Sequence, residues 1–296
     1  MKIWYTHNKE KSECGMVIMI KLRYTFKSDI LFKMVFVKYP ELLKNLVAAM
    51  LGILVESITD FEIMNPEMTP ESIEKKFCRL DINMRVNGQR VDLEIQVTDE
   101  KDYPERVMFY WARDYSSSLP AGEDYSKLPR TIIISILDFK LFDCEEYHSF
   151  FQPLETTRHT LLSDKMGFHF FELPKLPKDI CEDNILLLWL SLFNADTEEE
   201  LEKLSKLEVP VMSEAINAYY SVSNSSEYYE MERLREKTGH DEAQALHTAK
   251  QEGKEEKAVE IARNLMDVGM SIRQIMEVTG LTQDEVEKIY NAIYLS

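Results

Sequence analysis

Acidic side chains stand on both strands of a hairpin predicted for residues 79–97. Hydrophobic and polar residues alternate on each side of Asn87-Gly88, the dipeptide that most strongly favours a two-residue hairpin turn. This turn places Asp81 opposite Glu94 on the polar face. Side chains in such a pair have Cβ atoms roughly 4.5–5.5 Å apart. The spacing therefore predicts two carboxylates at close range.

Facing carboxylates repel each other, and a bound cation removes the conflict. Mg²⁺ is a hard ion that takes carboxylate oxygens, and such an ion can activate water and stabilise the charge that develops on a phosphate. The chemistry that fits is metal-dependent hydrolysis of a phosphate ester. A solvated outer face, on which Arg85 and Arg90 offset the acids, is the alternative. The residue pattern by itself favours that alternative.

Helices and strands with good local signals surround the hairpin. A helix begins at Asp29 behind Ser28, and a second begins near Glu41. Another runs from Asp102 to about Ser118, with Pro104 in its first turn. Continuous apolar residues predict a buried strand at 131–137. This order predicts an α/β fold, in which a mixed sheet is flanked by helices.

The second half of the chain is predicted to be mostly helical. A strand at 167–173 precedes helices near 182–193, 197–207 and 210–220, a charged helix at 239–269 and two short helices. The short helices begin with capping-box spacings, Ser271 with Gln274 and Thr282 with Glu285.

Composition excludes several classes of protein. The 296 residues carry a formal charge of −17, which argues against a passive, charge-driven coat on nucleic acid. The longest apolar run, 185–193, is about half the length that a membrane span needs, so no membrane partner is expected. Four scattered cysteines without a CxxC pair argue against a thiolate zinc site and favour a reducing, cytoplasmic compartment.

The order of motifs resembles a known nuclease core. An acid on one strand and an acid-x-polar triplet about a dozen residues later are similar to the PD-(D/E)XK nucleases. More narrowly, the chain resembles the PD-(D/E)XK nuclease family transposases, also called the Rpn family of recombination-promoting nucleases. The likeness covers about residues 24–240, and the C-terminal residues resemble the tail that these proteins often carry. The segments that carry it are DILFKMVF at 29–36, LDINM at 80–84, VDLEIQV at 91–97, ERVMFYWARDYSSSL at 105–119 and GEDY at 122–125.

The resemblance implies a restriction-endonuclease-like fold and a Mg²⁺- or Mn²⁺-dependent DNA endonuclease linked to recombination or transposition. Asp81 and Glu94 would be the metal-binding catalytic acids, with the Ile95 carbonyl as a candidate ligand. The family's first-helix acid would be Asp29, joining the metal site. Within the next helix, Arg106 and Tyr110 would contact DNA.

The chain departs from the family pattern at Gln96, which stands where the name-giving lysine would be. Glutamine can orient a water but supplies no positive charge, and Arg79, opposite Gln96, is a candidate source of that charge. Asp29 fits equally well as a helix-dipole residue, and Arg106 and Tyr110 as an ordinary exposed helix face. The alternative function is a catalytically inactive nuclease-like binding or assembly module.

The predicted domains are a leader at 1–22, a nuclease-like domain at 23–240 and a helical tail at 241–296. The nuclease-like domain divides into a core at about 24–150 and a mostly helical extension at 151–240. The two short helices of the tail resemble a helix-turn-helix. Residues 254–296 hold five basic and eight acidic residues, which disfavours reading of a DNA groove. We therefore expect these helices to contact protein, and a homo-oligomer could form through them.

Overall fold

The computed structural model describes residues 20–65, 82–179 and 181–294. The chain divides into two compact units, Met1–Glu232 and Arg233–Ser296. The first unit contains a six-stranded mixed sheet with the order β1-β2-β3-β4-β6-β5. The predicted α/β fold, a mixed sheet flanked by helices with a helical C-terminal region, is confirmed.

The sheet combines an antiparallel meander with a parallel centre. β1, β2 and β3 pair antiparallel, β3, β4 and β6 pair parallel, and β5 returns antiparallel on β6. The edge strands β1 and β5 were not predicted, because runs of three and four residues give too little alternation. The strand bounds are β1 Phe61–Ile63, β2 Ile82–Val86, β3 Gln89–Gln96, β4 Thr131–Leu137, β5 His148–Phe151 and β6 Met166–Glu172.

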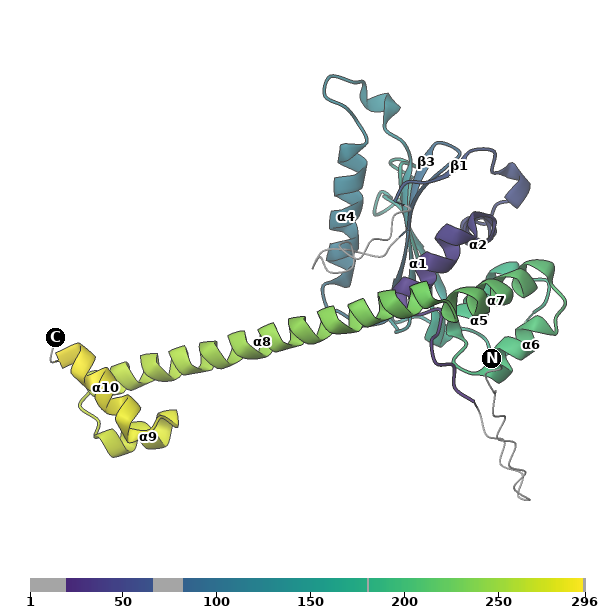
Figure 1. Ribbon diagram of the computed structural model, residues 1–296. Coiled ribbons are helices and arrows are strands. Elements are labelled where there is room, and N and C mark those ends of the chain that lie inside the picture. The colour runs from purple at the N-terminus through teal and green to yellow at the C-terminus, as the bar shows by residue number, and fades with distance from the viewer. Residues whose placement is uncertain (1–19, 66–81, 180, 295–296) are drawn as a thin grey trace, which may run out of the picture. The chain divides into compact units, whose positions relative to one another are not determined.

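Helices cover both faces of the sheet. One face is covered by α4, and the other by α1 and α2 (Figure 1). The apolar run at 185–193 forms the buried helix α5, and no helix in the described part of the chain is long and apolar enough to cross a membrane. The helix bounds in this unit are α1 Asp29–Lys38, α2 Pro40–Leu51, α4 Tyr103–Ser117, α5 Ile185–Asn194, α6 Glu198–Ser205 and α7 Pro210–Ser223.

The β2–β3 hairpin has the predicted two-residue turn. Asn87 and Gly88 adopt positive φ angles of 48° and 75°, as a type I′ turn requires. The strands pair in the predicted register, with Val86 opposite Gln89 and Ile82 opposite Leu93. The described ladder ends at that last pair.

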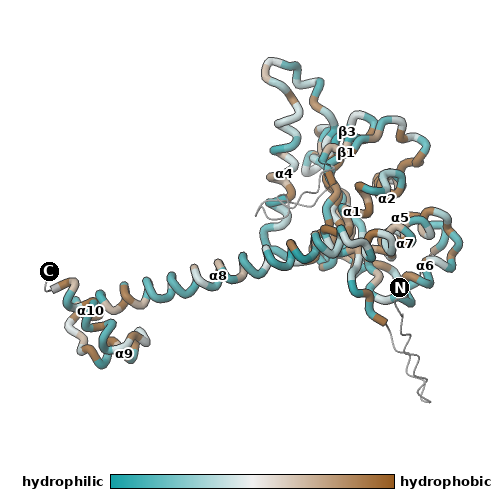
Figure 2. Tube along the Cα trace, in the orientation of Figure 1, coloured by the Kyte–Doolittle hydropathy of each residue, from teal (hydrophilic) through white to brown (hydrophobic). Residues whose placement is uncertain are grey.

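The second unit is helical. The long helix α8 (Ser226–Asp267) begins in the last residues of the first unit and supplies the first part of the second. It begins well before the predicted start near Gly239, and its residues are mostly hydrophilic (Figure 2). α9 (Ile272–Thr279) and α10 (Gln283–Tyr294) follow it. Both predicted capping boxes are present, since Gln274 Oε1 accepts from Ser271 N at 3.0 Å and Glu285 Oε2 from Thr282 N at 2.7 Å. A small core holds this unit together: Ala262, Met266, Ile275 and Val286.

Candidate active site

The acidic face of β3 is turned toward α4 and is buried. Asp92, Glu94 and Gln96 occupy every second position of the strand, so their side chains lie on the same face. Asp92 is 8% exposed and Glu94 is 6% exposed. Glu94 pairs in register with Ser135 of β4, and the neighbouring residues on that face pack beneath α4. A solvated outer face is therefore wrong for Asp92 and Glu94.

Farther along the hairpin the same face is open to solvent. Arg85 is exposed and forms ion pairs with Asp60 and Glu62. The solvated-face interpretation holds at this end, where mixed charges offset one another in water. The two ends of one polar face thus differ in environment, and the buried end carries the acids.

Two hydroxyl groups hold the Glu94 carboxylate. Tyr103 Oη, from the first residue of α4, donates to Glu94 Oε1 at 2.6 Å. Ser135 Oγ, from β4, donates to the same oxygen at 3.2 Å. Three elements therefore meet at this side chain. Hydrogen bonds to an ionised acceptor are among the stronger ones in proteins, so they restrict the orientation of the carboxylate.

The C-terminal part of α4 also contacts the sheet, as its first residue does through Tyr103. Arg90 of β3 forms an ion pair with Asp114 and donates to Ser118 Oγ at 2.9 Å. Burial raises the pKa of Asp114, although the Arg90 charge opposes this shift. Trp111 Nε1 donates to the Thr131 carbonyl at 2.9 Å. These contacts fix α4 against β3 and β4, with Tyr103 above Glu94.

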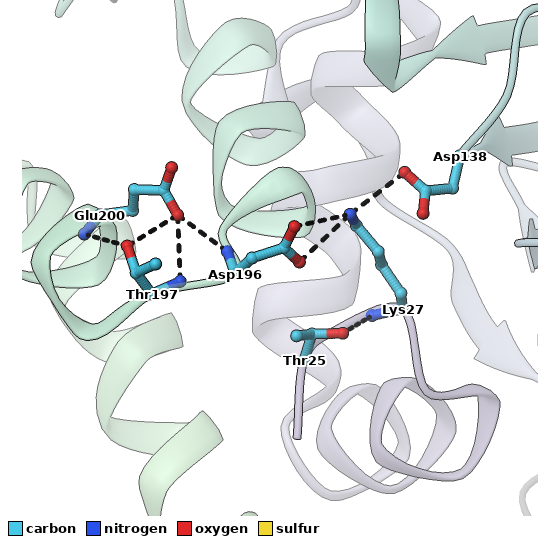
Figure 3. Close-up of polar contacts among 6 residues, drawn as sticks. All are labelled: Thr25, Lys27, Asp138, Asp196, Thr197 and Glu200. Atoms are coloured by element: carbon cyan, nitrogen blue, oxygen red, sulfur yellow. Dashed lines mark hydrogen bonds and ion pairs between the residues drawn. The ribbon is translucent and has the colours of Figure 1, made fainter. Parts of the chain in front are cut away.

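Gln96 ends β3 at the carboxyl edge of the parallel strands. Its side-chain Nε2 donates to the Thr98 carbonyl at 2.9 Å, and its backbone carbonyl accepts from Asp138 N at 3.0 Å. The Asp138 carboxylate in turn pairs with Lys27 Nζ at 3.1 Å, and Lys27 also pairs with Asp196 at 3.2 Å (Figure 3). This chain of contacts connects the segment just before α1 with the end of β3.

The predicted acid Asp29 is half-buried at the start of α1. Its Oδ1 accepts from Ile30 N at 2.9 Å, and Ser28 Oγ caps the helix by accepting from Leu31 N at 3.4 Å. One helical turn later, the Lys33 residue is 3% exposed. Asp29 thus occupies the helix-dipole position, two residues after Lys27 and its link to the end of β3.

Arg106 and Tyr110 lie one turn apart on α4, as predicted. The Arg106 guanidinium pairs with Glu100 and lies 5.0 Å from the centre of the Tyr103 ring. Tyr110 packs against the core beneath α4, and the Arg113 guanidinium lies 5.3 Å from its ring centre. The structure therefore brings Arg106 close to the tyrosine that binds Glu94.

Two predicted residues, Asp81 and Arg79, lie outside the described residues. Among those that are described, no group of three or more His, Cys, Asp or Glu side chains is arranged to hold a metal ion. The donor chemistry nevertheless fits a hard divalent cation. Asp92 and Glu94 are buried carboxylates on one strand face, and carboxylate oxygens are the ligands that such an ion prefers.

Sequence reasoning missed three side chains at this site, Asp92, Tyr103 and Ser135, and it also missed the buried Lys33 of α1. Lys33 could have been noticed as a lysine four residues after Asp29 in an otherwise apolar helix. Asp92 was assigned to the polar face without a role. Ser135 is the one hydroxyl residue inside the apolar run at 132–137. Tyr103 gave no signal beyond its place next to Pro104, because its role depends on the packing of α4 against β3.

Two parts of the chain match known protein families. Residues 26–249 match the family described as PD-(D/E)XK nuclease family transposase. Residues 255–290 match the family described as Rpn/YhgA-like nuclease family, C-terminal HTH domain. The helix-turn-helix resemblance of the tail is confirmed by this second match. Searches of curated proteins and of solved structures found no match.

Proposed function

Because the chain belongs to the PD-(D/E)XK nuclease family transposases, we propose that it is a divalent-metal-dependent DNA endonuclease that hydrolyses phosphodiester bonds. The observation that carries the proposal is the buried Glu94 carboxylate, held by Tyr103 and Ser135 beside the second buried acid, Asp92. A purely structural strand face under a helix would be apolar, since buried carboxylates are expensive.

Glu94 and Asp81 are proposed to hold Mg²⁺ or Mn²⁺, with Asp29 as a further acid. When bound, the ion supplies Lewis-acid stabilisation of the charge that develops on the phosphate. Gln96 is proposed to orient the attacking water through its side-chain amide. Arg106 and Tyr110 are proposed to contact the DNA backbone from α4. A link to recombination or transposition and a cytoplasmic location belong to the same proposal.

The direct test is incubation of the purified protein with supercoiled plasmid and Mg²⁺ or Mn²⁺. We expect nicked or linear products, and EDTA should abolish them. Asp81→Ala and Glu94→Ala should each lower the rate by about 100-fold or more. Glu62→Ala removes an exposed β1 carboxylate outside the site and should leave the rate unchanged. Cleavage that persists in both acid variants would contradict the assignment.

An inactive nuclease-like binding module is the second candidate. Its support is Gln96, which replaces a positively charged residue by a neutral one and whose amide donates to the Thr98 carbonyl. A module of this kind would bind DNA without cleaving it, and added Mg²⁺ or Mn²⁺ would produce no nicked or linear plasmid. The plasmid experiment separates the two candidates.

The C-terminal helix-turn-helix domain makes DNA a natural partner for the tail as well. Its residues 254–296 nevertheless carry more acids than bases, so we propose that its main contacts are with protein, including a second copy of the chain. A fluorescence anisotropy titration of the protein with duplex DNA over increasing salt checks this. An acidic domain should contribute little to the salt slope, so the slope should survive replacement of Arg273 and Lys288 by alanine.

A further inference from the structure

The Glu94 carboxylate accepts hydrogen bonds from Tyr103 of α4 and from Ser135 of β4, and the bond from Tyr103 is the shorter. We propose that Tyr103 is a positioning residue that presents the Glu94 carboxylate to the divalent ion, an inference that rests on the metal-dependent function proposed above. Tyr103 does not itself contact DNA or the ion in this proposal. It acts through Glu94, by fixing the rotation of the carboxylate about its side chain.

The hydrogen bond has the geometry of a strong one. Tyr103 Oη lies 2.6 Å from Glu94 Oε1, within the range of about 2.5–2.7 Å that is typical of a hydroxyl donating to a carboxylate. Ser135 Oγ approaches the same oxygen at 3.2 Å. Both donors converge on Oε1, and this convergence defines which way the plane of the carboxylate faces. The donors come from α4 and β4, so the orientation is set by tertiary packing.

The tyrosine ring itself cannot easily move. Tyr103 is 0% exposed, and its ring meets Phe139 and Phe170 edge-on, at centroid distances of 6.0 and 6.4 Å. Close-packed interiors resist such shifts, because every neighbour would have to move as well. The backbone is held too, since Tyr103 N donates to the Glu100 carbonyl at 3.0 Å. The position of the Tyr103 hydroxyl is therefore fixed by the packing of its ring and by its backbone hydrogen bond.

Arg106 of the same helix also contacts the Tyr103 ring. Its guanidinium lies 5.0 Å from the Tyr103 ring centre and also pairs with Glu100. A cation over an aromatic ring attracts the ring electrons, which favours a phenol that donates its proton in a hydrogen bond. Arg106 thus contributes to the position of Glu94 through Tyr103, in addition to its proposed contact with DNA.

The expected effect is on metal affinity. Side chains that hold a metal ligand in place typically change metal affinity or activity by about 10- to 100-fold when they are removed. Tyr103→Phe keeps the ring and its packing but deletes the hydroxyl. It should therefore weaken metal binding while the fold and the DNA-binding surface remain.

The test measures Mn²⁺ binding by electron paramagnetic resonance in the full-length protein, without DNA. We expect Tyr103→Phe to raise the Kd for Mn²⁺ by about 10-fold or more, and to raise the Mn²⁺ concentration needed for half-maximal cleavage by a similar factor. The KM for DNA at saturating Mn²⁺ should stay unchanged. Tyr115→Phe is the matched control, because it deletes a phenol on the same helix whose ring stacks on Trp111, and it should bind Mn²⁺ as the unaltered protein does.

Ser135→Ala provides a second variant in case Tyr103→Phe disturbs folding, which circular dichroism and the Tm would reveal. It removes the weaker donor and should raise the Kd for Mn²⁺ by a smaller factor. Equal Mn²⁺ affinity in the unaltered protein and in both variants would overturn the role of Tyr103 but leave the metal site intact. Absence of Mn²⁺ binding by the unaltered protein would instead overturn the proposed function, and the role of Tyr103 with it.

Discussion

Glu94 illustrates how one side chain acquires a chemical environment that its neighbours in sequence do not have. Arg85 lies on the same polar face of the hairpin but is exposed and paired with surface acids. Glu94 is 6% exposed and receives hydrogen bonds from α4 and β4. Burial makes its charge costly unless a cation or strong donors are close by. The hydroxyl groups of Tyr103 and Ser135 supply such donors for Glu94.

The proposed role of Gln96 predicts a change in the cleavage rate. Gln96→Ala should lower the cleavage rate by about 100-fold, because a group that orients the attacking water contributes to positioning in the transition state. The Kd for Mn²⁺ should stay within about twofold, since Gln96 is not a proposed metal ligand. Single-turnover cleavage assays at saturating Mn²⁺ measure the first quantity. An unchanged rate would show that Gln96 takes no part in the chemistry.

A histidine pair on β5 and β6 gives a prediction for pH dependence. His148 Nε2 and His169 Nδ1 are 3.0 Å apart. Burial, together with the charges of His148 and Arg130, lowers the pKa of His169 to about 4. The folded pKa is thus depressed below the unfolded value of 6.5. The neutral ring stabilises the fold above pH 6.5, and this contribution is lost as the pH falls toward 4.

We expect the free energy of unfolding to fall by on the order of 2 kcal/mol between pH 7 and pH 4 because of this group. Urea denaturation across this range measures the loss. His169→Phe keeps an aromatic ring against Phe150, which stacks on His169 at 4.2 Å, but cannot titrate. Its stability should therefore decline less steeply with acid. Identical slopes for the two proteins would contradict this assignment.

At the scale of elements, the β2–β3 hairpin and α4 build the site together. The hairpin turn is anchored by Asn87, whose Oδ1 accepts from Thr59 N at 2.9 Å and Asp60 N at 3.1 Å. Its Nδ2 donates to the Ser57 carbonyl at 2.8 Å. The turn therefore also holds the segment that leads into β1. Register in β2 and β3, and hence the face on which Glu94 lies, depends on this turn.

Asn87→Ala should destabilise the protein by about 2 kcal/mol, because it removes the side-chain hydrogen bonds of Asn87 and puts alanine, which tolerates positive φ less well than asparagine, at this position. Asn87→Gly loses the same hydrogen bonds but accepts the backbone conformation, so it should cost less. Urea unfolding of the two variants separates the contributions. Equal stability of Asn87→Ala and the unaltered protein would contradict the anchoring role of the Asn87 side chain.

Much of this element structure follows from local sequence. The Asn87-Gly88 turn, its register, the buried strand β4 and both capping boxes were predicted, because each depends on residues close together in the chain. The burial of Glu94 was not, since it depends on α4 crossing back over β3 through Tyr103 and the Arg90–Asp114 pair. The short strands β1 and β5 carry too few residues to show a period. Long-range packing is where the sequence alone was insufficient.

At the scale of the whole molecule, the chain has two compact units with separate cores. The core of the second unit is small, with Val286 0% and Ile275 1% exposed. The family match at residues 255–290 lies inside this unit, and the nuclease-like acids lie in the first. The division predicted at residue 240 stays a prediction, as does oligomer formation through the C-terminal helices.

Separate cores predict separate unfolding. Val286→Ala should destabilise the second unit by about 2 kcal/mol through loss of buried apolar contact, and the first unit should be unaffected. Differential scanning calorimetry should show two transitions, of which one moves to lower temperature. Cleavage of plasmid at 25 °C should be unchanged. A single transition that shifts as a whole would contradict two independent cores.

Thermal unfolding in increasing Mg²⁺ tests whether Glu94 belongs to a divalent-metal site. A ligand at about 100 times its Kd stabilises the folded state by about 2.7 kcal/mol, so the Tm should rise by about 5 °C or more. Glu62→Ala should show the same rise, and Glu94→Ala should show none. A Tm that Mg²⁺ leaves unchanged in the unaltered protein, or raises equally in Glu94→Ala, would mean that Glu94 does not bind the ion.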